Sequence, residues 1–163
     1  MAEPTPFSQA LYKNLERAET LALAVVIVAV AAHYLGFTSS TTLIVAGLSV
    51  LAALYFLMAF RPPEPIAEGT KMDFAFMLST TILPKILWIS SAVGASGLAL
   101  FHADPNKPGF KQMLIIQTLT ALVGFVVWGF SNMQGAQHLQ RLTPAILRAV
   151  PIMFAGAYII LQN

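Results

Sequence analysis

The sequence has 163 residues, of which 57% are hydrophobic and only 10% are charged. Soluble domains carry about 25% charged residues, so the composition excludes an ordinary water-soluble domain and predicts a small integral membrane protein. The formal charge of +2 is spread over single Lys and Arg residues, which argues against nucleic-acid binding, and the absence of cysteine excludes a disulfide framework and Cys-ligated metal sites.

The chain opens with an amphipathic stretch. Residues 7–19 carry apolar side chains at helical spacing among charged ones, which predicts a short interfacial helix. The n-region of a cleavable signal peptide is the alternative. Two apolar runs follow, 20–37 and 43–60, with a short polar turn between them. They predict a hairpin of two membrane spans.

The longest mainly apolar stretch is 72–101, where a single helix would rise about 45 Å against a hydrocarbon core of about 30 Å. Pro84 interrupts it and Lys85 follows at once. In one interpretation 72–83 lies flat on the membrane and Pro84 opens a span over 84–101. In the other, 72–83 extends the helix and carries Lys85 about 16 Å into the core. The first is favoured because an amine without a carboxylate is costly to desolvate.

The rest of the chain predicts a loop over 102–112, a fourth span over 113–130 and a polar segment over 131–143. Pro144 is expected in the first turn of a last helix, with a fifth span over 145–161 if Arg148 snorkels to the surface. The predicted fold is therefore all-α: one domain, 1–163, forming a polytopic transmembrane helical bundle of four to five spans.

Cations give the orientation. Most lie on the side of the N-terminus, which predicts a cytoplasmic N-terminus, and the cysteine-free composition suits a bacterial inner membrane. The expected interfacial anchors on that side are Arg17, Arg61, Arg141 and Arg148.

An internal repeat is a further hypothesis. Sliding the chain by about 70 residues puts Phe60 on Phe130 and His33 near His102. The bundle would then be a tandem repeat of two helical hairpins, each preceded by a short amphipathic interfacial helix.

Polar residues in the third span suggest a polar path. An ionisable residue inside a membrane is a functional hypothesis by default, and hydroxyls accompany Lys85 on the same stretch. No carboxylate at membrane depth is available to pair with it, so a snorkelling, orientation-setting lysine is the favoured alternative. The polar-path candidates are Lys85, Thr80, Thr81, Ser90 and Ser91.

Two histidines are expected on the outer side. His33, His102 and Asp104 offer imidazole and carboxylate ligands for a divalent metal, or groups that titrate near neutral pH. Their spacing fixes no geometry, and histidine is common at membrane interfaces. The sequence therefore predicts no metal and no cofactor, with these three as the only candidates.

Small residues recur at helical spacing. Small side chains let membrane helices approach closely. Packing inside the bundle is the simpler interpretation, and contact with a partner subunit is the alternative. The residues concerned are Ser49, Ala53, Ser90, Gly94, Gly97 and Gly124.

The first hairpin, which ends in LYFLMAFRPPE, resembles the two-span membrane hairpin of the gliding-motility and type IX secretion motor L subunits. The resemblance covers at most residues 20–64 and does not extend to an intramembrane Lys–Glu pattern. It therefore implies no function for this chain.

No enzymatic motif is present: there is no phosphate-binding Gly-Lys-Ser/Thr loop, His-Glu-x-x-His or Gly-x-Ser-x-Gly. The sequence thus predicts a non-enzymatic membrane subunit or scaffold, surrounded by lipid, that acts through helix packing against itself or another membrane protein. The alternative is a small transporter or channel around Lys85. A third interpretation, an interfacial lipid-modifying enzyme, requires Asp73 or Arg148 as a reactive group.

Overall fold

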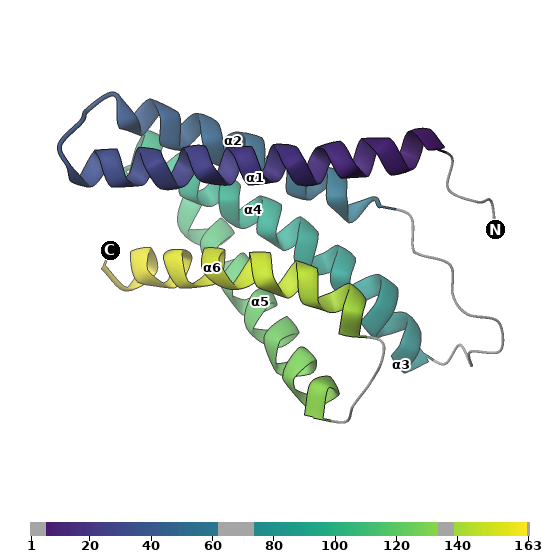
Figure 1. The fold of residues 1–163 in the computed structure, drawn as a ribbon. Helices are drawn as coiled ribbons and strands as arrows, with labels where there is room; N and C mark the ends of the chain where they lie inside the picture. The colour runs from purple at the N-terminus through teal and green to yellow at the C-terminus, as the bar shows by residue number, and fades with distance from the viewer. Residues whose placement is uncertain (1–5, 62–73, 134–138, 163) are drawn as a thin grey trace.

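The computed structural model describes residues 6–61, 74–133 and 139–162. Regular structure in these ranges is helical throughout, which confirms the predicted all-α bundle (Figure 1). The elements are α1 (Pro6–Tyr34), α2 (Ser40–Ala59), α3 (Phe74–Met77), the π-helical turn η1 (Leu78–Ile82), α4 (Leu83–Ala103), α5 (Phe110–Met133) and α6 (Leu139–Gln162).

Four stretches in the described ranges are long and apolar enough to cross a membrane: Ser40–Ala59, Leu78–Ala103, Phe110–Asn132 and Leu142–Gln162. The protein is therefore a multi-pass helical membrane protein. Helix α1, whose first half carries the charged residues, is not one of these four, so a fifth span over 20–37 stays a prediction.

Helix α1 corrects one predicted boundary. The interfacial helix 7–19 and the span 20–37 form one unbroken helix of 29 residues, because no glycine or proline interrupts residues 7–35. Gly36 ends it in a left-handed conformation, with φ of 88°. The Phe37 amide donates to the Ala32 carbonyl and the Gly36 amide to that of His33. This Schellman cap turns the chain directly into α2.

The stretch around Pro84 corrects a second prediction. Elements α3, η1 and α4 follow one another without a break from Phe74 to Ala103, so Pro84 does not open a span, and residues 74–83 extend the helix. The Leu83 amide donates to the carbonyl of Leu78, five residues back. This wider turn is a π-bulge, a known way for a helix to accommodate a local disturbance such as a proline. Residues 72 and 73 lie outside the described ranges.

Lys85 lies level with the end of α2, although the helix that carries it begins eleven residues earlier, at Phe74. The rings of Tyr55 on α2 and Trp88 on α4 are 5.6 Å apart, and Tyr55 is four residues before the end of α2. Because the two helices run antiparallel (Figure 1), the α4 residue level with that end lies about four residues before Trp88, beside Lys85. We call this end, which also holds Arg61, the arginine end.

The opposite end holds the turns 35–39 and 104–109, and we call it the histidine end. His33 and His102 meet there, with ring centres 6.4 Å apart. The start of α6 corrects a third prediction. The helix begins at Leu139, five residues before Pro144, so Pro144 lies inside the helix and not in its first turn.

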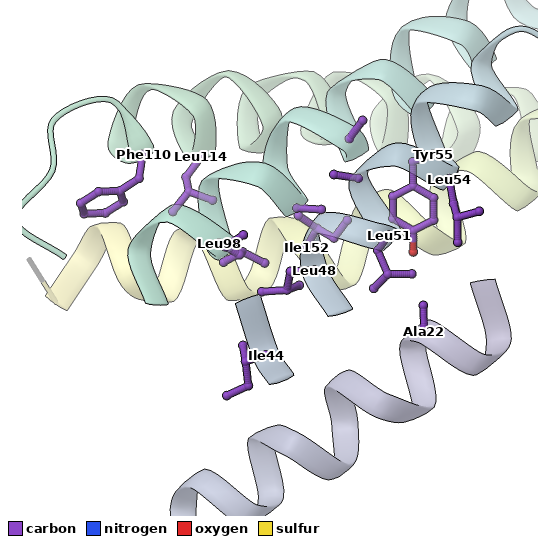
Figure 2. Packing of buried hydrophobic residues seen from close by; sticks show 14 of the residues in the cluster. Ala22, Ile44, Leu48, Leu51, Leu54, Tyr55, Leu98, Phe110, Leu114 and Ile152 are labelled. Carbon is purple, nitrogen blue, oxygen red and sulfur yellow. The ribbon is translucent and has the colours of Figure 1, made fainter. Parts of the chain in front are cut away.

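The core is built around α2 and α4. Ile44, Leu48 and Leu51 of α2 pack with Leu98 of α4, and Figure 2 shows this cluster continuing to α5 and α6 through Leu114 and Ile152. A second cluster joins Leu87 of α4 to the arginine-end halves of α5 and α6. The fully buried Gln117 of α5 donates its amide to the carbonyl of Ala149 on α6 at 2.9 Å.

The two hairpins correspond in length. Helix α1 has 29 residues and the run Phe74–Ala103 is one residue longer, and each is followed by a short turn and a returning helix. The tandem repeat stays a prediction, which this correspondence supports.

The structure predicts opposite effects for two glycine substitutions. A Cβ on Gly94 would meet the Gln117 side chain and, at 2.6 Å, the Cγ2 of Ile152, whereas Gly129 has nothing within 4 Å. We expect Gly94→Ala to lower the free energy of unfolding by about 1–3 kcal/mol through overpacking. Gly129→Ala should raise it by about 0.5–1 kcal/mol through helix propensity. Unfolding of both variants in mixed detergent micelles measures this, and equal stability of the two would contradict the packing described.

Candidate functional site

The most unusual feature of the bundle is a buried ion pair between α1 and α6. The Arg148 Nε and Nη2 donate to the two carboxylate oxygens of Glu19 at 2.6 and 2.9 Å. The side chain of Glu19 is 6% exposed and that of Arg148 30%. Two parallel N–H···O bonds of this kind fix the orientation of both groups as well as neutralising them.

Two aromatic residues complete the cluster. Tyr55 is buried next to Glu19 and Arg148, and the guanidinium of Arg148 lies 5.3 Å from the ring centre of Trp88. The remaining Arg148 nitrogen, Nη1, donates to the carbonyl of Pro144 at 3.1 Å. We call Glu19, Tyr55, Trp88 and Arg148 the charged cluster. Each of the three guanidinium nitrogens of Arg148 donates a hydrogen bond.

The charged cluster joins parts of the bundle whose backbones do not meet. Within the described residues, only α2 packs its backbone closely against α1. The Glu19 and Arg148 side chains span the gap from α1 to α6, and Tyr55 and Trp88 fill it from α2 and α4. The arrangement is that of a clamp, because each charge is held by its partner and neither is presented as a free base or nucleophile.

A second ion pair lies at the surface of the arginine end. Arg61 donates to Glu16 at 2.9 Å, with side chains 49% and 52% exposed. The Arg61 guanidinium is 5.5 Å from the ring centre of Tyr12. Exposed pairs of this kind contribute about 0–1 kcal/mol, so the pair serves as a natural reference for the buried one.

Glu19 is not among the site residues that the sequence predicts, and Arg148 is predicted only as an interfacial anchor. A signal was available: Glu19 is the last acid before an apolar run, and Arg148 is a lone cation inside another. Both fall toward the same end of their predicted spans. What the sequence lacked was the packing order that brings the first and last helices within reach of one another.

The polar-path candidates are not brought together. Lys85 is exposed on the bundle surface, whereas Thr80, Ser90 and Ser91 are buried and Thr81 is half-buried. The buried hydroxyls donate to carbonyls of their own helix: Thr80 to Phe76 at 2.6 Å, and Ser90 and Ser91 to Leu87 at 3.1 and 2.8 Å.

The histidine candidates are partly brought together. His33 and His102 come from helices far apart in sequence and their rings are in edge-to-face contact. Asp104 accepts a hydrogen bond from the Asn106 amide at 3.0 Å. Within the described residues, no three His, Cys, Asp or Glu side chains are grouped so that they could hold a metal ion.

The small residues divide into two sets. Ser90, Gly94, Gly97 and Gly124 are buried between helices, whereas Ser49 and Ala53 are exposed on the outer face of α2. Among the remaining anchors, Arg17 is exposed, and the side chain of Arg141 lies outside the described part of the chain.

Comparisons with protein-family models, curated proteins and solved structures give no match to this chain.

The two ion pairs predict a difference in stability. Removing one partner of a buried pair typically costs about 3–5 kcal/mol because it strands the other charge. We expect the lower part of that range for Arg148→Ala and for Glu19→Gln, since Arg148 is partly exposed. Arg61→Ala should cost about 0–1 kcal/mol.

A double-mutant cycle on Glu19 and Arg148, with the Glu16–Arg61 cycle as its control, measures the coupling free energy directly. If the two cycles gave the same coupling, the charged cluster would not be the clamp described.

Proposed function

We propose that this protein is a non-enzymatic subunit or scaffold of a membrane complex, which packs against itself or another membrane protein through the outer face of α2. Its role is that of a rigid helical partner. The observation that carries the proposal is the division of the small residues into a buried set and an exposed set.

The exposed set lies on one side of α2. Its members follow one another at intervals of four, three and four residues, and all are exposed on the bundle surface: Thr42, Ala46, Ser49 and Ala53. The Ser49 hydroxyl donates to the Val45 carbonyl at 2.8 Å, so this polar group is already satisfied within the helix. A helix face with short side chains allows a second helix to approach closely.

The polar interior also favours a structural role. The charged cluster is neutral in sum and its donors are used within the chain. A transport path needs polar groups that remain available to a passing solute or ion. The buried hydroxyls of α4 and η1 donate instead to their own helix.

We propose a bacterial inner membrane as the setting of this protein. The positions of the cations support a cytoplasmic N-terminus there. Arg17, Arg61 and Lys85 gather toward the arginine end, whereas Lys107 and Lys111 belong to the turn and first residues of α5 at the histidine end. By the positive-inside rule the arginine end faces the cytoplasm.

Site-directed cross-linking tests the proposed interface. The chain contains no cysteine, so Ala53→Cys or Ser49→Cys introduces a single thiol. In native membranes under mild oxidation we expect either variant to form a disulfide-linked dimer, or a mixed adduct with a partner when a thiol-reactive cross-linker is used.

Ala24→Cys is the matched control, because Ala24 is also a small exposed residue but lies on α1. It should remain uncross-linked. A strictly monomeric protein with no co-purifying partner, and equal labelling without adducts at all three positions, would refute the proposed function.

Ion flux through liposomes separates the proposed function from the transporter alternative. Under the proposed function we expect the unaltered protein to give no more ion flux through reconstituted liposomes than empty liposomes do. Lys85→Ala should leave that level unchanged, because Lys85 is exposed and the buried hydroxyls donate to their own helix. Flux that is present in the unaltered protein, lost in Lys85→Ala and kept in Lys85→Arg would favour the alternative.

A further inference from the structure

Two histidines meet at the histidine end. His33 lies in the last turn of α1 and His102 in the last turn of α4. Their ring centres are 6.4 Å apart and the ring planes are inclined by 80°. His33 is exposed and His102 half-buried, so both imidazoles have surface that the protein does not cover.

The hydrogen bonds of Ser40 determine how His33 is presented. The Ser40 hydroxyl donates its one proton to the carbonyl of Phe37, so its oxygen can only accept from the Nδ1 of His33, which lies 3.4 Å away. A proton on Nδ1 leaves the lone pair of a neutral imidazole on Nε2. A hydrogen bond at one ring nitrogen is also how metal-ligating histidines are oriented.

We propose that His33 and His102 form a two-imidazole binding site for a divalent transition-metal cation of the Zn²⁺ or Cu²⁺ type. Imidazole suits these ions. Metal–nitrogen bonds of about 2.0–2.1 Å put two rings that share an ion about 5–6 Å apart between centres, so the observed pair needs to close by about 1 Å. Water completes the coordination sphere, since the described residues offer no third ligand in place.

Metal binding at this site has a structural consequence. Within the described residues, α1 packs its backbone closely only against α2, and at the histidine end the rings of His33 on α1 and His102 on α4 are in contact. An ion shared by His33 and His102 ties the outer end of α1 to α4. Because an ion that binds only the folded chain stabilises it, the metal should raise the unfolding temperature.

Calorimetric titration tests the site, with the full chain in detergent, purified without a histidine tag and titrated with Zn²⁺. We expect saturable binding of one ion per chain. His33→Ala and His102→Ala should each weaken the affinity at least tenfold. The third histidine of the chain, His138, provides the matched control: His138→Ala should bind as the unaltered protein does.

Unchanged affinity in both His33→Ala and His102→Ala, or loss of binding in His138→Ala, would overturn the proposal. Electron paramagnetic resonance of the unaltered protein with one equivalent of Cu²⁺ provides a test that no variant's folding can disturb. Hyperfine coupling to two imidazole nitrogens supports the site, and coupling to one or none refutes it.

Discussion

The bundle depends most on the contact between Glu19 and Arg148. The Glu19 carboxylate is almost wholly removed from water between helices, where an isolated charge is very costly. Its bidentate hydrogen bonds from the partly exposed Arg148, at 2.6 and 2.9 Å, offset that cost. Neither charge is tolerable there without the other. The first and last described helices are therefore obliged to lie on the same side of α2 and α4, although they are 129 residues apart at this contact.

The rest of the packing follows a different rule. Apolar side chains gain little from leaving lipid for protein, so close approach and van der Waals contact decide which helix faces meet. Gly94 and Gly124 let Gln117 and Leu87 approach at distances that a Cβ would prevent, and a Cβ on Gly97 would crowd Leu114 at 3.1 Å. The small residues on the outer face of α2 are exposed in the described part of the chain, and the proposed partner helix would pack against that face by the same rule.

The sequence by itself determined the class and much of the element list. A composition of 57% hydrophobic and 10% charged residues leaves lipid as the only suitable solvent, and in lipid the backbone must satisfy its own hydrogen bonds, which helices do. Glycine, proline and polar residues predicted turns at 38–42 and 102–112, and the structure has these turns at 35–39 and 104–109. The sequence also predicted His33 and His102 at the same end of the bundle, because successive helices reverse direction at each turn.

Only the tertiary structure decided which residues meet across the bundle. Proline disfavours a helix interior, yet the π-bulge keeps the helix continuous through Pro84, because its hydrogen bonds reach back five residues there. Glu19 looked like an interfacial acid and Arg148 like a snorkelling cation, since each seemed unpartnered in its own segment. Their pairing depends on helix order and rotation, which arise from contacts among all helices and leave no local pattern in the sequence.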